Sequence, residues 1–175
     1  MFTKEIIENY FLSYSQVHLF LCLVAVATII VAAIFYWAIK KEYYKGIAIG
    51  IIGFAFAFGS YGYVNYTKAD RLRKINTYNY DLHPEYLKTK ELPRIATLKT
   101  IITIIGIVHV LLLAISFYLS NYYLKKATYL SGIFIGIFMM SIIALGACYF
   151  VKSKTKSYEE GILEFTKEIR VAFLL

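Results

Sequence analysis

Residues 100–124 read TIITIIGIVHVLLLAISFYLSNYYL, a run of 25 residues with no Asp, Glu, Lys or Arg. A bilayer with a hydrocarbon core about 30 Å thick is crossed by roughly 20 apolar residues of helix. Three further stretches are equally free of charge and at least 22 residues long: residues 9–39, 46–67 and 127–151. All 19 basic and all 11 acidic residues lie outside the four stretches. This pattern predicts four transmembrane helices.

The composition of the whole chain is that of a protein embedded in lipid. Hydrophobic residues make up 59% of it, and its mean hydropathy is +0.61. These values exclude a soluble enzyme domain, a free nucleic-acid-binding protein and a secreted disulfide scaffold. Cys22 and Cys148 lie in apolar stretches without partners at metal-ligand spacing, so we interpret both as small hydrophobic residues. We expect no metal and no other cofactor.

The expected fold class is an all-α polytopic membrane protein, with a four-transmembrane-helix bundle made of two hairpins. The spans are placed at residues 17–39, 46–64, 100–120 and 129–151. The predicted domain organisation is an N-terminal amphipathic segment at 1–15, a four-span membrane bundle at 16–151 with a cytosolic loop at 68–99, and a C-terminal cytosolic helix at 152–175.

The distribution of basic residues favours one orientation in the membrane. Four spans place both termini on one side; that side holds 14 basic residues, and the other side holds five. Basic residues near the ends of spans are retained in the cytoplasm. We therefore predict a multi-pass protein of the cell membrane with both termini cytoplasmic. This topology explains the sequence pI near 9.3, so no direct nucleic-acid partner is needed to account for it.

The segments that open the second and fourth spans are similar to each other. Residues 46–51 read GIAIGI, residues 132–137 read GIFIGI, and each segment follows a short basic turn. An internal repeat would relate the two hairpins by an axis along the membrane normal, as in some transporters. Chance similarity between spans rich in Ile and Gly is the other interpretation, and both stay open at this point.

Small residues mark the faces through which transmembrane helices approach each other closely. One such stripe, with 4-3-4-3 spacing in the second span, consists of Gly46, Gly50, Gly53, Ala57 and Ser60. We call it the small-residue stripe and predict that it packs against another helix. Any small-residue face left uncovered would favour a homo-oligomer or line a pore.

Histidine near the middle of a span is a candidate functional residue, because an ionisable group in lipid is costly unless it is neutral and paired. His109 has this position. It could line a pore, or it could be a neutral imidazole that bonds within a helix contact, and we favour the second interpretation because no span contains a carboxylate. His18 lies close to a span end, where we expect it to be hydrated.

Both terminal segments have amphipathic patterns. Residues 3–15 predict a short helix lying on the inner membrane surface. In the tail, Ser157 and Glu160 have the spacing of a capping box, which predicts a separate helix from there onward. Its apolar stripe consists of Ile162, Phe165, Ile169 and Phe173. We interpret this stripe either as a contact within the protein or its oligomer, or as a binding site for a cytosolic partner.

The start of the predicted cytosolic loop carries a basic cluster: Lys68, Arg71, Arg73 and Lys74. It contains no helix breaker, so the second span could continue through it, and Pro93 could open the third helix. The cluster is either a site for anionic lipid headgroups or an acidic partner, or a set of charges that only determines topology.

No Ser-His-Asp arrangement, P-loop, dinucleotide fingerprint or zinc pattern occurs in the sequence, and His83-Pro84-Glu85 alone is a weak site signal. We therefore expect a protein that is not an enzyme. The first expected function is an oligomeric membrane anchor or sensor that docks a cytosolic protein. Its layout is similar to that of small four-span membrane components of immunity or phage-defence systems, which implies a role in defence. The alternative is an oligomeric ion channel or small transporter.

Overall fold

The computed structural model describes residues 2–124 and 128–172, with the backbone alone for residue 124 and residues 168–172. These residues form helices and contain no strand. The four long helices are α1 (Lys4–Ala33), α2 (Glu42–Leu82), α3 (Leu92–Leu124) and α4 (Tyr129–Ala172). Two π-helical turns, η1 (Ile34–Ala38) and η2 (Leu87–Glu91), extend α1 and lead into α3. The predicted all-α fold with four helices is confirmed.

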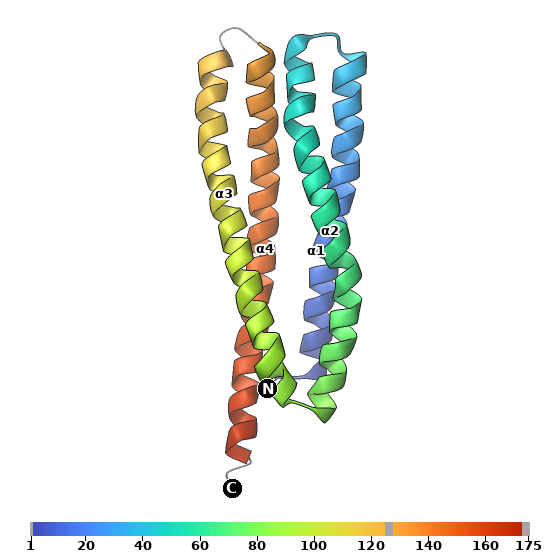
Figure 1. Cartoon of the computed structure of the whole chain (residues 1–175), viewed down its shortest axis with the longest axis vertical. Coiled ribbons are helices and arrows are strands. Elements are labelled where there is room, and N and C mark those ends of the chain that lie inside the picture. Colours follow the sequence, from blue (N-terminus) through green and yellow to red (C-terminus); the bar gives the residue numbers. More distant parts are fainter. Residues whose placement is uncertain (1, 125–127, 173–175) are drawn as a thin grey trace.

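The helices form two antiparallel hairpins, α1–α2 and α3–α4, that lie side by side (Figure 1). Both described chain ends lie at the same end of the bundle, together with the turn between α2 and η2 (Figure 1). We call this the basic end. The opposite end, where α1 joins α2, is called the turn end.

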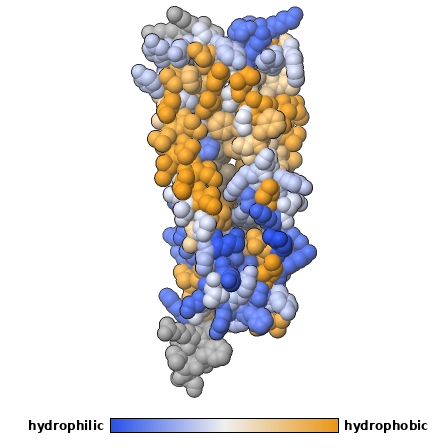
Figure 2. Space-filling view, viewed as in Figure 1, coloured by the Kyte–Doolittle hydropathy of each residue, from blue (hydrophilic) through white to orange (hydrophobic). Residues whose placement is uncertain are grey.

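All four helices are long and apolar enough to cross a membrane. Figure 2 shows apolar side chains gathered in a band across the upper half of the bundle, with hydrophilic side chains at both ends of that band. At a rise of 1.5 Å per residue, the 41 residues of α2 extend about 60 Å, twice the thickness of a hydrocarbon core. The helix therefore continues far beyond the apolar band, as the absence of a helix breaker after Thr67 predicts.

Glycine brings α2 and α4 into backbone contact near the turn end. A Cβ atom built on Gly46 would lie 2.1 Å from the Tyr129 carbonyl oxygen, and one built on Gly132 would lie 2.0 Å from the Tyr43 carbonyl oxygen. One turn further, a Cβ on Gly50 would lie 2.4 Å from the Ile133 carbonyl oxygen. No side chain fits at these distances, so only glycine permits this packing.

The contact is reciprocal, and it joins the two similar segments GIAIGI and GIFIGI. A Cβ on Gly46 or on Gly132 would lie 3.1 Å from the Cα of the other, and a Cβ on Gly136 would lie 3.2 Å from the Gly50 Cα. A local two-fold axis along the bundle would produce this arrangement. It accords with the internal-repeat interpretation of the two hairpins, because matched residues occupy matched places.

The helix α3 is peripheral, whereas α2 is central. Within the described residues, the backbone of α3 comes within 8 Å (Cα–Cα) of α4 and η2 but not of α1 or α2. Only 11% of the most apolar window of α3 is buried, against 39% for α2. Most of the apolar side chains of α3 therefore face outward.

The predicted interfacial helix at residues 3–15 is wrong. These residues form the first turns of α1, which continues without a break to Ala33. Ile7, Tyr10 and Phe11 are buried inside the basic end instead of facing a membrane surface. The amphipathic pattern identified the apolar face correctly, but this face packs against the other helices and not against a membrane surface.

The tail is not a separate helix either, because α4 runs from Tyr129 to Ala172 without interruption. Ser157 lies inside this helix, and its hydroxyl donates to the Ser153 carbonyl at 3.4 Å, so the predicted capping box is wrong. The predicted loop at 68–99 is mostly helical as well. Only residues 83 and 84 lie outside helical segments, and Pro93 lies in the first turn of α3.

We predict that Gly46→Ala lowers the free energy of unfolding by about 2 kcal/mol, because the new methyl group must displace the backbone of α4. Gly146→Ala is the matched control, since a Cβ there has no neighbour within 4 Å. It should be neutral or stabilising by up to about 1 kcal/mol. Denaturation in mixed micelles, followed by far-UV circular dichroism, measures both. Equal effects of the two substitutions would contradict the glycine contact.

Candidate functional site

The basic end has an apolar core of its own, separate from the core near the turn end. All four long helices and η2 contribute to it. Its buried members are Phe2, Ile7, Tyr10, Phe11, Tyr14, Ala69, Leu87, Ile95, Ile102, Val151, Tyr158 and Ile162. The part of the chain beyond the apolar band is therefore a packed helical body.

A buried ion pair lies within this core. The Glu91 side chain in η2 is 2% exposed, and both of its oxygens accept hydrogen bonds from the Arg94 guanidinium, at 2.7 and 2.6 Å. This two-pronged geometry is the strongest that a carboxylate and a guanidinium form. The guanidinium also lies 5.6 Å from the centre of the Phe11 ring, so it contacts α1 as well. The pair thus ties the start of α3 to α1.

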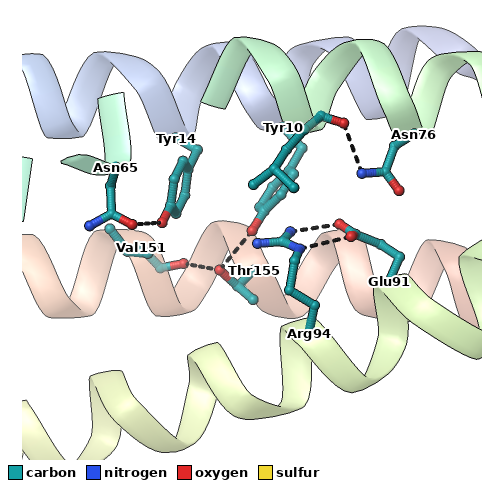
Figure 3. A network of polar contacts seen from close by, with 9 residues as sticks. Tyr10, Tyr14, Asn65, Asn76, Glu91, Arg94, Val151 and Thr155 are labelled. Atoms are coloured by element: carbon teal, nitrogen blue, oxygen red, sulfur yellow. Dashed lines mark hydrogen bonds and ion pairs between the residues drawn. The ribbon is translucent and has the colours of Figure 1, made fainter. Parts of the chain in front are cut away.

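Two stacked tyrosines join α1 to α4 beside this ion pair. The rings of Tyr10 and Tyr158 are 4.0 Å apart and nearly parallel. The Thr155 hydroxyl donates its only proton to the Val151 carbonyl at 2.7 Å, so at 3.4 Å it accepts from the Tyr10 hydroxyl (Figure 3). Burial raises the pKa of both phenols, with the Glu91 carboxylate adding to the rise at Tyr158. Both phenols therefore stay protonated.

Several polar atoms of this region are buried without a hydrogen-bond partner among the described residues. Asn76 is fully buried; its Nδ2 donates to the Leu72 carbonyl at 2.9 Å, while its Oδ1 has no partner. The Tyr158 hydroxyl and the Thr77 hydroxyl are also buried and unpartnered. Few of the buried polar side chains in this core are therefore hydrogen-bonded to one another. The two hydrogen bonds between Glu91 and Arg94 are the strongest among them.

The described part of the tail packs on the same chain. Ile162 is fully buried, and the Phe165 ring stacks on Tyr80 of α2 at 4.9 Å and lies 5.5 Å from the Phe2 ring. An ion pair between Lys99 and Glu159, 2.5 Å long, adds a link from α3 to α4. The predicted partner residues Ile162 and Phe165 are thus used inside the protein. The Ile169 side chain and Phe173 lie outside the described residues.

The basic cluster lies on the outer surface of α2. Arg73 and Lys74 both donate to Asp70, each at 2.7 Å. The Lys74 ammonium, followed by the Arg73 guanidinium, holds the pKa of Asp70 below its usual range. Lys68 and Arg71 are exposed and form no ion pair within residues 2–124 and 128–167. Of the four residues of the basic cluster, these two are therefore the ones that can pair with an external anionic group.

The small-residue stripe divides into two parts. Gly46 and Gly50 pack against α4 as predicted, so they cannot line a path through the bundle. Gly53, Ala57 and Ser60 are exposed, and a Cβ on Gly53 would meet no atom within 4 Å. In the part of the chain that the structure describes, the lower half of the stripe is therefore exposed.

His109 is half-buried, and its described contacts are with its own helix and with α2. Its Nδ1 donates to the Ile105 carbonyl of its own helix at 2.8 Å, and its ring meets Phe54 edge-on with centres 6.0 Å apart. The contact with Phe54 places the His109 ring beside α2. Neither of the two contacts involves a residue of the basic cluster.

The expectation that His18 is hydrated is wrong, because this residue is fully buried. Its Nδ1 lies 2.6 Å from the Tyr14 carbonyl, which can only accept, so Nδ1 carries the proton and Nε2 is left as a buried acceptor without a described partner. The hydroxyl of Tyr14 donates to Asn65 of α2 at 3.0 Å (Figure 3). His18 follows Tyr14 by one helical turn, so extending the amphipathic face of residues 3–15 would have placed it inside.

The ion pair was also missed from the sequence, although its i, i+3 spacing is a usable signal. For the described ranges, no group of three metal-binding side chains occurs. At His83-Pro84-Glu85 the backbone forms a turn, in which the Tyr86 amide donates to the His83 carbonyl at 2.8 Å. Comparison of the chain with protein-family models, curated proteins and solved structures finds no match.

We predict that Arg94→Met destabilises the protein by about 3 kcal/mol, because it leaves the Glu91 carboxylate buried without its partner. Replacing both residues, as in Glu91→Leu/Arg94→Met, should recover most of this loss, since no buried charge remains. Arg73→Met breaks an exposed pair and should cost less than about 1 kcal/mol. The same micelle unfolding assay measures all three. A double variant no more stable than Arg94→Met would contradict this role of the pair.

Proposed function

We propose that this protein is a non-enzymatic, multi-pass protein of the cell membrane whose basic end lies in the cytoplasm and docks a cytosolic protein. The excess of basic residues at the basic end supports this orientation. The apolar band between two polar ends supports the position of the membrane (Figure 2).

The observation that carries the proposal is the combination of a packed body and an exposed basic face at the basic end. Contacts from α1 and α4 hold α2 in place, among them the hydrogen bond from Tyr14 to Asn65 and the stack of Phe165 on Tyr80. On the outer side of α2, Lys68, Arg71 and the 61% exposed Tyr78 share a face. Tyrosine and arginine on a rigid support are typical of protein-binding surfaces.

The charge of this face determines the kind of partner. Asp70 neutralises part of the basic cluster, and the remaining cations, Lys68 and Arg71, carry no described counter-ion. An acidic protein surface would supply carboxylates that pair with both cations. The tail to Phe165 packs within the protein, so α2 rather than the apolar stripe of the tail is the proposed docking surface.

Photo-crosslinking in intact cells tests the proposal, with a photoreactive phenylalanine analogue in place of Tyr78. The matched control is Tyr118, which is 70% exposed at the turn end. We expect a discrete adduct with a different protein from position 78 only. Lys68→Glu/Arg71→Glu should lower its yield at least about five-fold, because two favourable charge contacts become repulsive.

Lys88→Glu/Lys90→Glu is the matched control for the change of charge, because both lysines are exposed at the basic end but belong to η2. This variant should keep the adduct. Adducts that contain only lipid or only a second copy of this chain would overturn the docking function, as would a yield that does not respond to charge reversal on α2.

A second candidate function is an oligomeric channel or small transporter, and one observation favours it. The exposed residues Gly53, Ala57 and Ser60 leave part of α2 uncovered, where a second copy could pack or a path could form. Liposomes that contain only this protein test it. Ion flux that is lost in Ala57→Leu and in His109→Leu would support conduction over docking.

A further inference from the structure

A groove of about 370 Å³ runs between α3 and α4. Residues of α3 on one side and of α4 on the other form its walls, among them Ile102, Gly106, Val110, Leu145, Tyr149 and Lys152. The volume is within the range of about 300–1,000 Å³ found for small-molecule sites. The groove is open along its length, and its surface is largely apolar.

The sequence explains why the groove is open. Gly106 supplies no side chain at the centre of the α3 wall, and a Cβ there would meet no atom within 4 Å. The backbone of α3 approaches neither α1 nor α2, so no other described helix covers this side. Toward the basic end, the buried Ile102 and the ion pair between Lys99 and Glu159 hold α3 against α4. The groove therefore has a closed end at the polar part of the bundle.

Among the described residues that line the groove, the only charged one lies at this closed end. Lys152 is the first charged residue after the uncharged stretch 127–151. It is exposed and has no ion pair among the described residues. The 78% exposed Tyr149 lies one turn away, as is typical of aromatic side chains at the depth of lipid headgroups. An apolar groove that ends in an unpaired cation is complementary to a molecule with an apolar chain and an anionic head.

We propose that the groove binds one phospholipid with a net negative headgroup, whose acyl chain lies between α3 and α4 and whose headgroup contacts Lys152. This inference rests on the proposed position of the membrane but not on the docked protein. From Leu145 to Lys152, seven residues of helix extend about 10 Å, so the groove holds the part of an acyl chain nearest the headgroup. The lipid comes from the leaflet at the basic end.

Native mass spectrometry of the purified protein, with phosphatidylglycerol or phosphatidylcholine added, tests the proposal. We expect one phosphatidylglycerol to bind at least about five-fold more tightly than phosphatidylcholine, and Lys152→Gln to remove this preference. Gly106→Leu fills the groove and should reduce binding of phosphatidylglycerol about ten-fold.

Two matched controls separate the groove from the general lipid-facing surface. Gly146→Leu adds the same side chain at another open position, on α4, and Lys154→Gln removes a neighbouring exposed lysine. Both should bind phosphatidylglycerol like the unmodified protein. Equal loss in Gly106→Leu and Gly146→Leu, or equal binding of the two lipids by the unmodified protein, would overturn the site. So would a dimer that is lost in Gly106→Leu without a change in lipid binding.

A second measurement leaves the groove wall intact, in case Gly106→Leu does not fold. Cys148 lines the groove, and Cys22, the other cysteine, can be replaced by alanine. A bound acyl chain should slow maleimide labelling of Cys148 in phosphatidylglycerol micelles at least about three-fold relative to phosphatidylcholine, and Lys152→Gln should abolish the difference. An unchanged rate would contradict the proposal. The Tyr78 adduct is independent of both assays, so failure of lipid binding and failure of docking are distinguishable.

Discussion

The backbone contact between α2 and α4 determines how the two hairpins are combined. At Gly46 and Gly132 the helices approach so closely that a methyl group on either would overlap a carbonyl oxygen of the other. In lipid, where burial of apolar surface gives helices little reason to associate, such close packing is a main source of attraction. The contact fixes α2 and α4 at the centre, and α1 and α3 occupy the outer positions of their hairpins (Figure 1).

The basic end uses a different kind of attraction. Outside the apolar band, burial of aromatic and aliphatic side chains is favourable again, and residues such as Phe2, Phe11 and Tyr158 form a core like that of a soluble bundle. The buried pair of Glu91 and Arg94 then gives this core a defined arrangement, because either charge alone would be costly there. Two forms of packing therefore hold one set of continuous helices, with glycine contacts at the turn end and a conventional core at the basic end.

The sequence predicted the features that depend on local patterns. The uncharged stretches identified the four helices, and the spacing of Gly46 and Gly50 identified a true contact face. Wrong predictions came where one pattern fits two environments. An amphipathic segment such as residues 3–15 can face lipid or protein, and Ser157 has the spacing of a cap although it lies inside a helix. The polar cluster around Glu91 joins η2 to three helices, and such long-range pairing leaves no trace in local periodicity.

The two hairpins pack symmetrically at the turn end but not at the basic end. This difference exposes the outer surface of α2 and the groove between α3 and α4, on which the two proposals depend. Near the turn end, matched glycines of the two hairpins face each other. At the basic end α1 approaches α4, but α3 does not approach α2. The aromatic side chains of α1, among them Tyr10, fill the centre there, and of the four long helices only α4 has its backbone close to that of α3. The outer surface of α2 and the groove beside α3 are both left uncovered, so the two hairpins present a basic surface and an apolar groove at different places.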